Sequence, residues 1–214
     1  MPNRKNSYAK GAELTAEDRR RLSDIIPGVE PSLARCSSGP RRGKTYPVAE
    51  THLIGNERLY LNQCIDSNWI SSKGRFVDKF ERAFAREAGC EYAVACASGT
   101  VALHLVLAAL GIGPNDEVIV PAFTMIATAN AVKYTGATVK LVDSEPVSLN
   151  IDPDLIERAI TQNTKALIVV HTYGHPAQMH RLLKIANVRD LFLIEDAAEA
   201  HGAEISGSGL AASG

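Results

Sequence analysis

The stretch Leu-Phe-Leu-Ile-Glu-Asp-Ala-Ala-Glu-Ala-His-Gly-Ala, residues 191–203, decides the fold. Its first part, Leu191–Glu195, is mostly apolar and branched or aromatic, which is typical of a strand buried on both faces of a parallel sheet. The strand ends at two adjacent acids, and open α/β sheets place their ligands at the carboxyl ends of strands. Asp196 is therefore the first candidate functional residue. The alternative is that Glu195 and Asp196 cap the following turn as solvated acids.

Strand and helix patterns alternate through the rest of the chain. Five segments have the composition of strands: Tyr92–Ala97, Glu117–Val120, Thr138–Val142, Ala166–Val170 and Leu191–Glu195. Six have a helical pattern: Asn56–Asp66, Gly74–Gly89, Thr100–Leu110, Ile126–Tyr134, Pro153–Thr161 and Ala177–Ala186. This alternation predicts an α/β fold of three layers, in which helices cover both faces of a mostly parallel sheet.

Composition excludes several classes of protein. The chain has 214 residues, of which 45% are hydrophobic and 22% charged, so it is long enough to bury a sizeable core. No apolar signal segment opens it, and the longest apolar run, residues 101–112, is too short to span a bilayer. We therefore expect a cytoplasmic protein with no membrane partner. The four cysteines form no C-x-x-C pair, which favours buried thiols over a zinc site or disulfides.

Charge divides the chain into parts. Residues 1–45 hold ten Lys and Arg against five Asp and Glu, a charge of +5, whereas the remainder carries −6. This head lacks interleaved aromatic residues, so we expect a basic, disordered leader that binds no nucleic acid, with one short helix at Thr15–Ile26. Residues 46–205 form the predicted domain. Residues 206–214 are rich in Ser and Gly and are expected to be a flexible tail.

Three strand ends carry residues suited to one ligand. Ser98-Gly99-Thr100 precedes a helix whose free amides favour a phosphate, although Ser98 as an ordinary N-cap is the alternative. In the next turn, Phe123 or Met125 could cover a flat ring or simply pack in the core. With a carboxylate at the third strand end, these groups describe a site for a flat, phosphorylated, nitrogenous ring.

A metal site is a further alternative. The loop after Val170 contains His171 and His175, and His180 follows. Gly174 and Pro176 deny these imidazoles a common helical face, which argues against a metal centre. We expect no bound metal.

Residues 46–205 resemble the DegT-type nucleotide-sugar aminotransferases, which use pyridoxal phosphate on the fold-type-I scaffold. The similar segments occur in the family's order: Pro47–Glu57, Trp69–Val77, Ser98–His104, Gly111–Val118 and Glu195–Ala203. The Trp69-Ile-Ser-Ser opening and Glu199 look most like the GDP-perosamine synthase subgroup. The resemblance implies the large cofactor-binding domain of this fold, here incomplete at its C-terminus.

The resemblance assigns roles by position. Asp196 matches the carboxylate that pairs with the pyridine nitrogen of pyridoxal 5'-phosphate, and Glu199 matches the residue that faces the ring hydroxyl. The phosphate-binding turn is matched by Gly99, Thr100 and Val101. Met125 matches a position usually filled by a stacking aromatic, so the cover here is a softer thioether.

The lysine that forms the Schiff base in this family is absent, so no catalytic residue is assigned. The lysines of the body match no such position: Lys73, Lys79, Lys133, Lys140, Lys165 and Lys184. We therefore expect the amino-terminal part of a longer aminotransferase, inactive by itself. The resemblance implies that the full-length parent is a homodimer.

For that parent the resemblance implies transfer of an amino group, from glutamate, to a nucleotide-linked 4-keto-6-deoxysugar in cell-surface polysaccharide biosynthesis. An inactive module that binds the cofactor or a nucleotide sugar is one alternative. A metal-dependent hydrolase using Asp196, His171 and His201 is another. A related dehydratase branch, which has histidine in place of the lysine, also remains open.

Overall fold

The computed structural model describes residues 53–205 and 208–209. The chain divides into two compact units, Met1–Ile54 and Gly55–Gly214, and every described helix and strand belongs to the second. The predicted leader, including its helix at Thr15–Ile26, lies outside the described residues.

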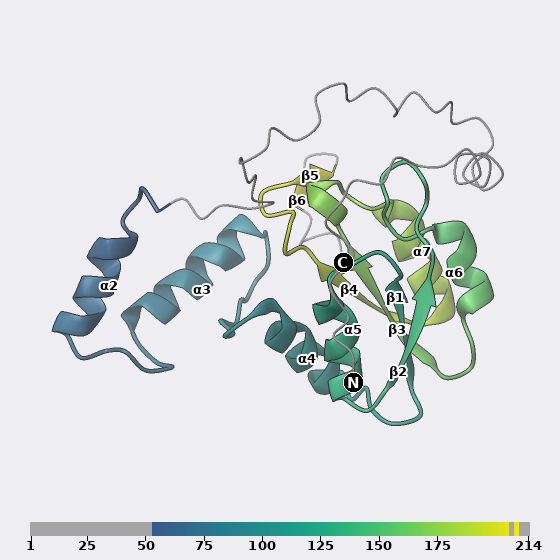
Figure 1. Ribbon diagram of the computed structural model, residues 1–214, viewed down its shortest axis with the longest axis horizontal. Coiled ribbons are helices and arrows are strands. Elements are labelled where there is room, and N and C mark those ends of the chain that lie inside the picture. The colour runs from purple at the N-terminus through teal and green to yellow at the C-terminus, as the bar shows by residue number, and fades with distance from the viewer. Residues whose placement is uncertain (1–52, 206–207, 210–214) are drawn as a thin grey trace, which may run out of the picture. The chain divides into compact units, whose positions relative to one another are not determined.

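Four strands form a parallel sheet at the centre of the second unit (Figure 1). They are β1 (Glu117–Pro121), β2 (Thr138–Val142), β3 (Thr164–Val170) and β4 (Phe192–Asp196). Their order across the sheet is β2-β1-β3-β4, and all three pairings are parallel. The predicted α/β class and parallel sheet are confirmed.

Within the described residues, six α-helices accompany these strands. They are α2 (Glu57–Asp66), α3 (Arg75–Glu87), α4 (Gly99–Ala109), α5 (Ile126–Tyr134), α6 (Pro153–Ala159) and α7 (Met179–Arg189). Local chemistry fixes several of their ends. The Asp152 side chain accepts a hydrogen bond from the Asp154 amide, and Pro153 supplies a helix-compatible φ without an amide that needs a partner.

Side-chain alternation in the strands builds two cores. Val118 and Val120 of β1 pack with Leu107 of α4 and Val132 of α5 on one face of the sheet. Ile119, between them, packs on the other face with residues of α6 and α7. Because successive side chains of a strand point to opposite faces, an uninterrupted apolar strand serves both cores. Helices on both sides of the sheet complete the predicted three layers (Figure 1).

The predicted first strand, Tyr92–Ala97, is wrong, because this segment joins no ladder within the described residues. Tyr92 is 78% and Val94 70% exposed, so the two largest apolar side chains that suggested a strand are not packed in the core. The Ala95 amide donates instead to Oε1 of Glu81 in α3, at 2.8 Å. A strand requires a partner for its amides and carbonyls, and composition alone cannot supply one.

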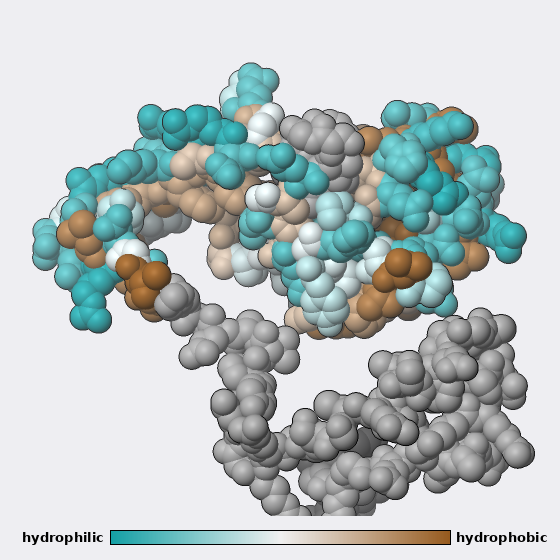
Figure 2. Space-filling model, turned by 90° about the horizontal axis from the view of Figure 1, so that it is seen from above, coloured by the Kyte–Doolittle hydropathy of each residue, from teal (hydrophilic) through white to brown (hydrophobic). Residues whose placement is uncertain are grey.

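Two short strands follow the sheet. Glu204–Ile205 (β5) pairs antiparallel with Ser208–Gly209 (β6), within a stretch that sequence composition left without regular structure. Apolar side chains on the surface form separate patches in Figure 2. One source is α2, which buries none of its residues and exposes Leu59, Leu61 and Ile65. Among the helices of the described residues, none has the length and apolar character to cross a membrane.

Candidate functional site

The carboxyl end of β4 sends its two acids to opposite faces of the sheet. Ile194 belongs to the core beneath α4 and α5, so Asp196, two residues on, lies on the same face. Leu193 packs in the core beneath α6 and α7, and Glu195 therefore faces that side. The alternation therefore gives the two neighbouring carboxylates different environments and different hydrogen-bond partners.

Asp196 makes its main contact with α5. Its Oδ2 accepts a hydrogen bond from the hydroxyl of Thr128 at 2.8 Å, and the Thr128 hydroxyl lies 3.0 Å from that of Thr124. Thr128 is fully buried and Asp196 is half-buried. The other carboxylate oxygen, Oδ1, receives only a long bond of 3.3 Å from the Ala198 amide. Asp196 is thus held by the fold rather than turned into bulk water.

Glu195 is bound to a buried histidine. Nε2 of His171, whose side chain is fully buried, lies 3.1 Å from Oε2 of Glu195. Nδ1 of the same ring accepts a hydrogen bond from the Ala177 amide at 3.1 Å. A nitrogen that accepts carries no proton, so the ring is neutral and donates from Nε2 to the carboxylate.

His171 is therefore unsuited to bind a metal, because both of its ring nitrogens have protein partners. His175 and His180 are exposed. No group of three or more His, Cys, Asp or Glu in the described part of the chain is arranged to hold a metal ion. The hydrolase alternative, which needs His171 as a ligand, is not favoured.

The loop after β3 is fixed by a buried amide. The side chain of Asn150, which is 1% exposed, accepts from the Thr172 amide through Oδ1 and donates to the His175 carbonyl through Nδ2, both at 2.9 Å. Asn150 comes from the connection between β2 and α6. In that connection the Ser148 hydroxyl, assisted by two backbone amides, lowers the pKa of Glu145. The β2–α6 connection, stabilised by its own hydrogen bonds, therefore holds the loop after β3 at the carboxyl edge of the sheet.

Glu199 joins the same edge. Its Oε2 accepts from the Tyr173 amide at 2.8 Å, which ties the turn after β4 to the 3-10 helix η2 (Thr172–Gly174) after β3. Gly174 has φ of +80°, and a Cβ there would lie 3.1 Å from the Glu199 carbonyl, so the close approach of the two loops requires glycine.

The start of α4 presents amides to solvent. The Ser98 side chain accepts from the Val101 amide at 3.4 Å, as an ordinary N-cap does. This engages Val101 but leaves the amides of Gly99 and Thr100 at the open helix start. Apart from the neighbours of Gly99 in the chain and the backbone of its own helix, no atom of the described residues lies within 4 Å of the position that a Cβ on Gly99 would take. The space beside the helix start is therefore free for a ligand.

Met125 lies at the N-cap position of α5 and is 68% exposed. Phe123, two residues earlier, is 44% exposed and packs its ring edge-to-face with Tyr173 at 6.2 Å. Neither side chain is buried in the core, the alternative that the sequence left open. Both stand on the turn after β1, next to the loop after β3.

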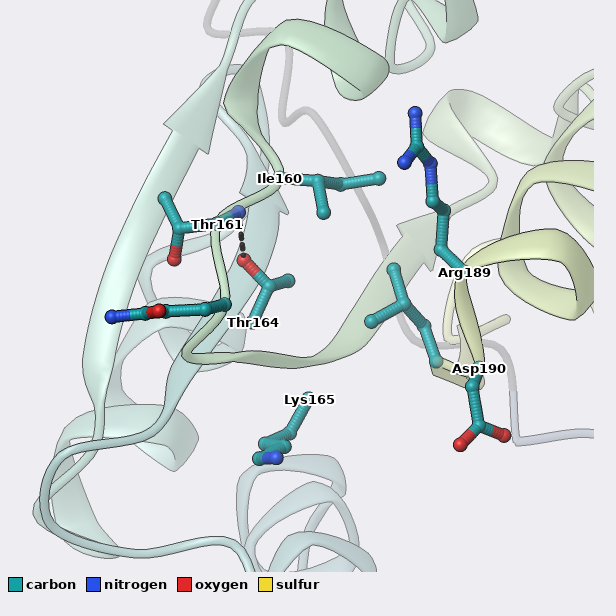
Figure 3. Close-up of a pocket in the computed structure, with 8 residues that line it drawn as sticks. Ile160, Thr161, Thr164, Lys165, Arg189 and Asp190 are labelled. Carbon is teal, nitrogen blue, oxygen red and sulfur yellow. Dashed lines mark hydrogen bonds between the residues drawn. The ribbon is translucent and has the colours of Figure 1, made fainter.

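A surface pocket of about 490 Å³ lies at the opposite edge of the sheet (Figure 3). It is lined by Thr161 before β3 and Thr164 at its first position, and by Arg189 and Asp190 at the end of α7. These residues lie at the amino ends of the strands, whereas ligands of open α/β sheets bind at the carboxyl ends. We therefore do not take this pocket as the candidate site, although it is concave.

The structure thus brings Asp196, Glu199 and the turn that bears Met125 to one edge of the sheet, while their roles toward a ligand remain predictions. Sequence reasoning missed Thr128 and Asn150. Thr124 and Thr128 stand four residues apart, a spacing that places both on one side of a helix start. Asn150 carried no signal, because its partners lie 22 and 25 residues away.

Residues 52–214 match the model of the DegT/DnrJ/EryC1/StrS aminotransferase family. GDP-perosamine synthase of Escherichia coli O157:H7 is 50% identical over 164 residues, which are 77% of this chain and 45% of that protein. The predicted likeness to GDP-perosamine synthases is therefore confirmed as a similarity of sequence. The chain spans less than half the length of the curated relative it matches.

Two solved structures extend the likeness to three dimensions. DesV of S. venezuelae is 42% identical, with a TM-score of 0.64 over 71% of this chain and 43% of that one. E. coli GDP-4-keto-6-deoxy-D-mannose-3-dehydratase with bound hydrated PLP is 33% identical, with a TM-score of 0.70 over 77% of this chain and 43% of that one. Over about three quarters of its length, the chain therefore shares its fold with these two solved structures.

Replacing Asn150 by Ala should lower the free energy of unfolding by about 2–4 kcal/mol, because a buried amide and a carbonyl lose their partners. Urea unfolding followed by circular dichroism measures the loss, and hydrogen exchange should show faster exchange at the Thr172 amide. Asn163→Ala, at an exposed turn, is the matched control and should change stability by less than about 0.5 kcal/mol. Equal effects of the two substitutions would contradict the anchoring role of Asn150.

Proposed function

Since the chain belongs to the DegT/DnrJ/EryC1/StrS aminotransferase family, we propose that its full-length parent transfers an amino group to the 4-keto group of a nucleotide-linked 6-deoxysugar. The 50% identity to GDP-perosamine synthase supports this substrate class. Glutamate is the proposed amino donor, and synthesis of a cell-surface polysaccharide is the proposed use of the product. The homodimer and the cytoplasmic location remain predictions.

Three groups of this chain have the chemistry to hold pyridoxal phosphate. A half-buried carboxylate with one lightly bonded oxygen suits a cationic ring nitrogen, and Asp196 provides it. The amides of Gly99 and Thr100, at the start of α4 beside open space, suit a phosphate group. An exposed thioether, Met125, suits the face of a flat ring. The carboxylate, the amides and the thioether thus suit the ring nitrogen, the phosphate and the ring face of the cofactor, respectively.

Pyridoxal phosphate would supply an electron sink for the carbanion formed during amino transfer. The task of Asp196 is then to keep a proton on the pyridine nitrogen, because an anion beside that nitrogen favours its charged form. The amides of Gly99 and Thr100 would hold the phosphate. Glu199 has one oxygen bound to the Tyr173 amide, and we propose that its other oxygen faces the ring hydroxyl.

Sugar dehydration is the second candidate function, and one structural likeness supports it. The fold is shared with a sugar 3-dehydratase that holds hydrated PLP, at 33% identity. The aminotransferase ranks first because the identity to GDP-perosamine synthase is higher. Reading the gene beyond codon 214 separates the two, since a lysine in the segment that follows the aspartate strand supports amino transfer and a histidine there supports dehydration.

Asp196→Asn should weaken binding of pyridoxal phosphate by roughly tenfold or more, because the amide cannot pair with a cationic nitrogen as a carboxylate does. Equilibrium dialysis of the purified chain, with the bound cofactor followed by absorbance, measures this affinity. The control is Asp190→Asn at the opposite edge of the sheet, where φ of 54° suits asparagine. Equal affinities of wild type and Asp196→Asn, or no binding by the wild type, would overturn the proposed cofactor site.

Borohydride treatment of the chain with pyridoxal phosphate should leave no stoichiometric covalent adduct at a single lysine. Among the described residues, lysines lie in helices, within β2, at the start of β3 or before α3, and none follows the carboxyl end of a strand. Peptide mass spectrometry detects the reduced adduct, with a lysine-containing aminotransferase of the same cofactor class as the positive control. One fully labelled lysine would refute the proposal that these 214 residues alone are inactive.

A further inference from the structure

The buried hydroxyl of Thr128 has two side-chain partners, Asp196 and Thr124. The residue is fully buried in the first turn of α5, a helix that also buries Ala131 and Val132. Its hydroxyl reaches across to β4 and meets Oδ2 of Asp196, 68 residues away in sequence, at 2.8 Å. A buried hydroxyl without a partner is costly, so the pairing restrains both side chains.

The direction of the protons in this contact can be deduced. A threonine hydroxyl has one proton, and a carboxylate can only accept. Thr128 therefore gives its proton to Asp196, and in its 3.0 Å contact with Thr124 it must accept. The result is a relay in which Thr124 donates to Thr128 and Thr128 donates to Asp196. Each donor polarises the next, which strengthens the last bond to the carboxylate.

The relay also connects two parts of the proposed cofactor site. Thr124 and Thr128 flank Met125, which is exposed at the N-cap position of α5. The start of α5 therefore bears Met125, which we propose covers the ring, and also binds Asp196, which we propose pairs with the ring nitrogen. The remaining oxygen of Asp196 has only the long 3.3 Å bond from Ala198, so the torsion of the carboxylate is set mainly by Thr128.

We propose that Thr128, backed by Thr124, is the positioning residue that holds the Asp196 carboxylate in the orientation required by the pyridine nitrogen. The inference rests on the proposed function, because it assumes that Asp196 faces this cofactor. Thr128 itself would not touch the ring. It acts by removing the rotational freedom of the carboxylate before the cofactor arrives, which lowers the cost of binding.

The test compares Thr128→Val, which keeps the shape and deletes the hydroxyl, with Thr128→Ser, which keeps the hydroxyl. Thr138→Val is the matched control at an exposed position of β2. Dialysis against pyridoxal phosphate should show roughly tenfold weaker binding by Thr128→Val, with Thr128→Ser and Thr138→Val near wild type. A purely structural role would instead lower stability without changing the affinity of the folded fraction, and that outcome would overturn the proposal.

A measurement without cofactor separates this inference from the proposed function. In the free protein, the buried Thr128 hydroxyl proton should give a slowly exchanging NMR signal with a proton–proton contact to the β-protons of Asp196, absent in Thr128→Val. Failure to detect that contact would overturn the relay. If the contact is present but the wild type does not bind pyridoxal phosphate, the relay stands as a structural feature, while the proposed function and the positioning role that depends on it fall.

Discussion

The alternation of side chains at the end of β4 is the constraint on which the site depends. Ile194 and Asp196 share one face of the strand, and Glu195 occupies the other. The buried residues of the sheet fix this register, because a slip by one residue would turn Ile194 and Leu193 to the wrong cores and exchange the two acids between the faces. Burial of the core thereby decides which carboxylate pairs with a threonine relay and which with a neutral histidine.

The loops at this edge depend on one another. Asn150 from the β2–α6 connection holds the loop after β3, and that loop gives its Tyr173 amide to Glu199 in the turn after β4. Thr128 then links β4 to α5. Most of these contacts join segments far apart in sequence and use buried or half-buried polar groups. A site assembled in this way is organised by the fold before any ligand binds.

The sequence predicted the parallel sheet, most helix bounds and the position of Asp196, because apolar runs and cap residues act locally. It failed at Tyr92–Ala97, where an apolar run has no strand beside it in the described part of the chain. It also missed Thr128 and Asn150, whose partners are far away in sequence. Periodicity reports which face of an element is apolar, but it carries no information about which buried polar group meets which.

A structure of the chain with pyridoxal phosphate is the most direct test of the central claim that the end of β4 and the start of α4 form one cofactor site. The account predicts the ring nitrogen at the Asp196 carboxylate, the phosphate on the amides of Gly99 and Thr100, and the Thr128 hydroxyl still bound to Asp196. A cofactor bound at the opposite edge of the sheet, beside Arg189, would contradict it.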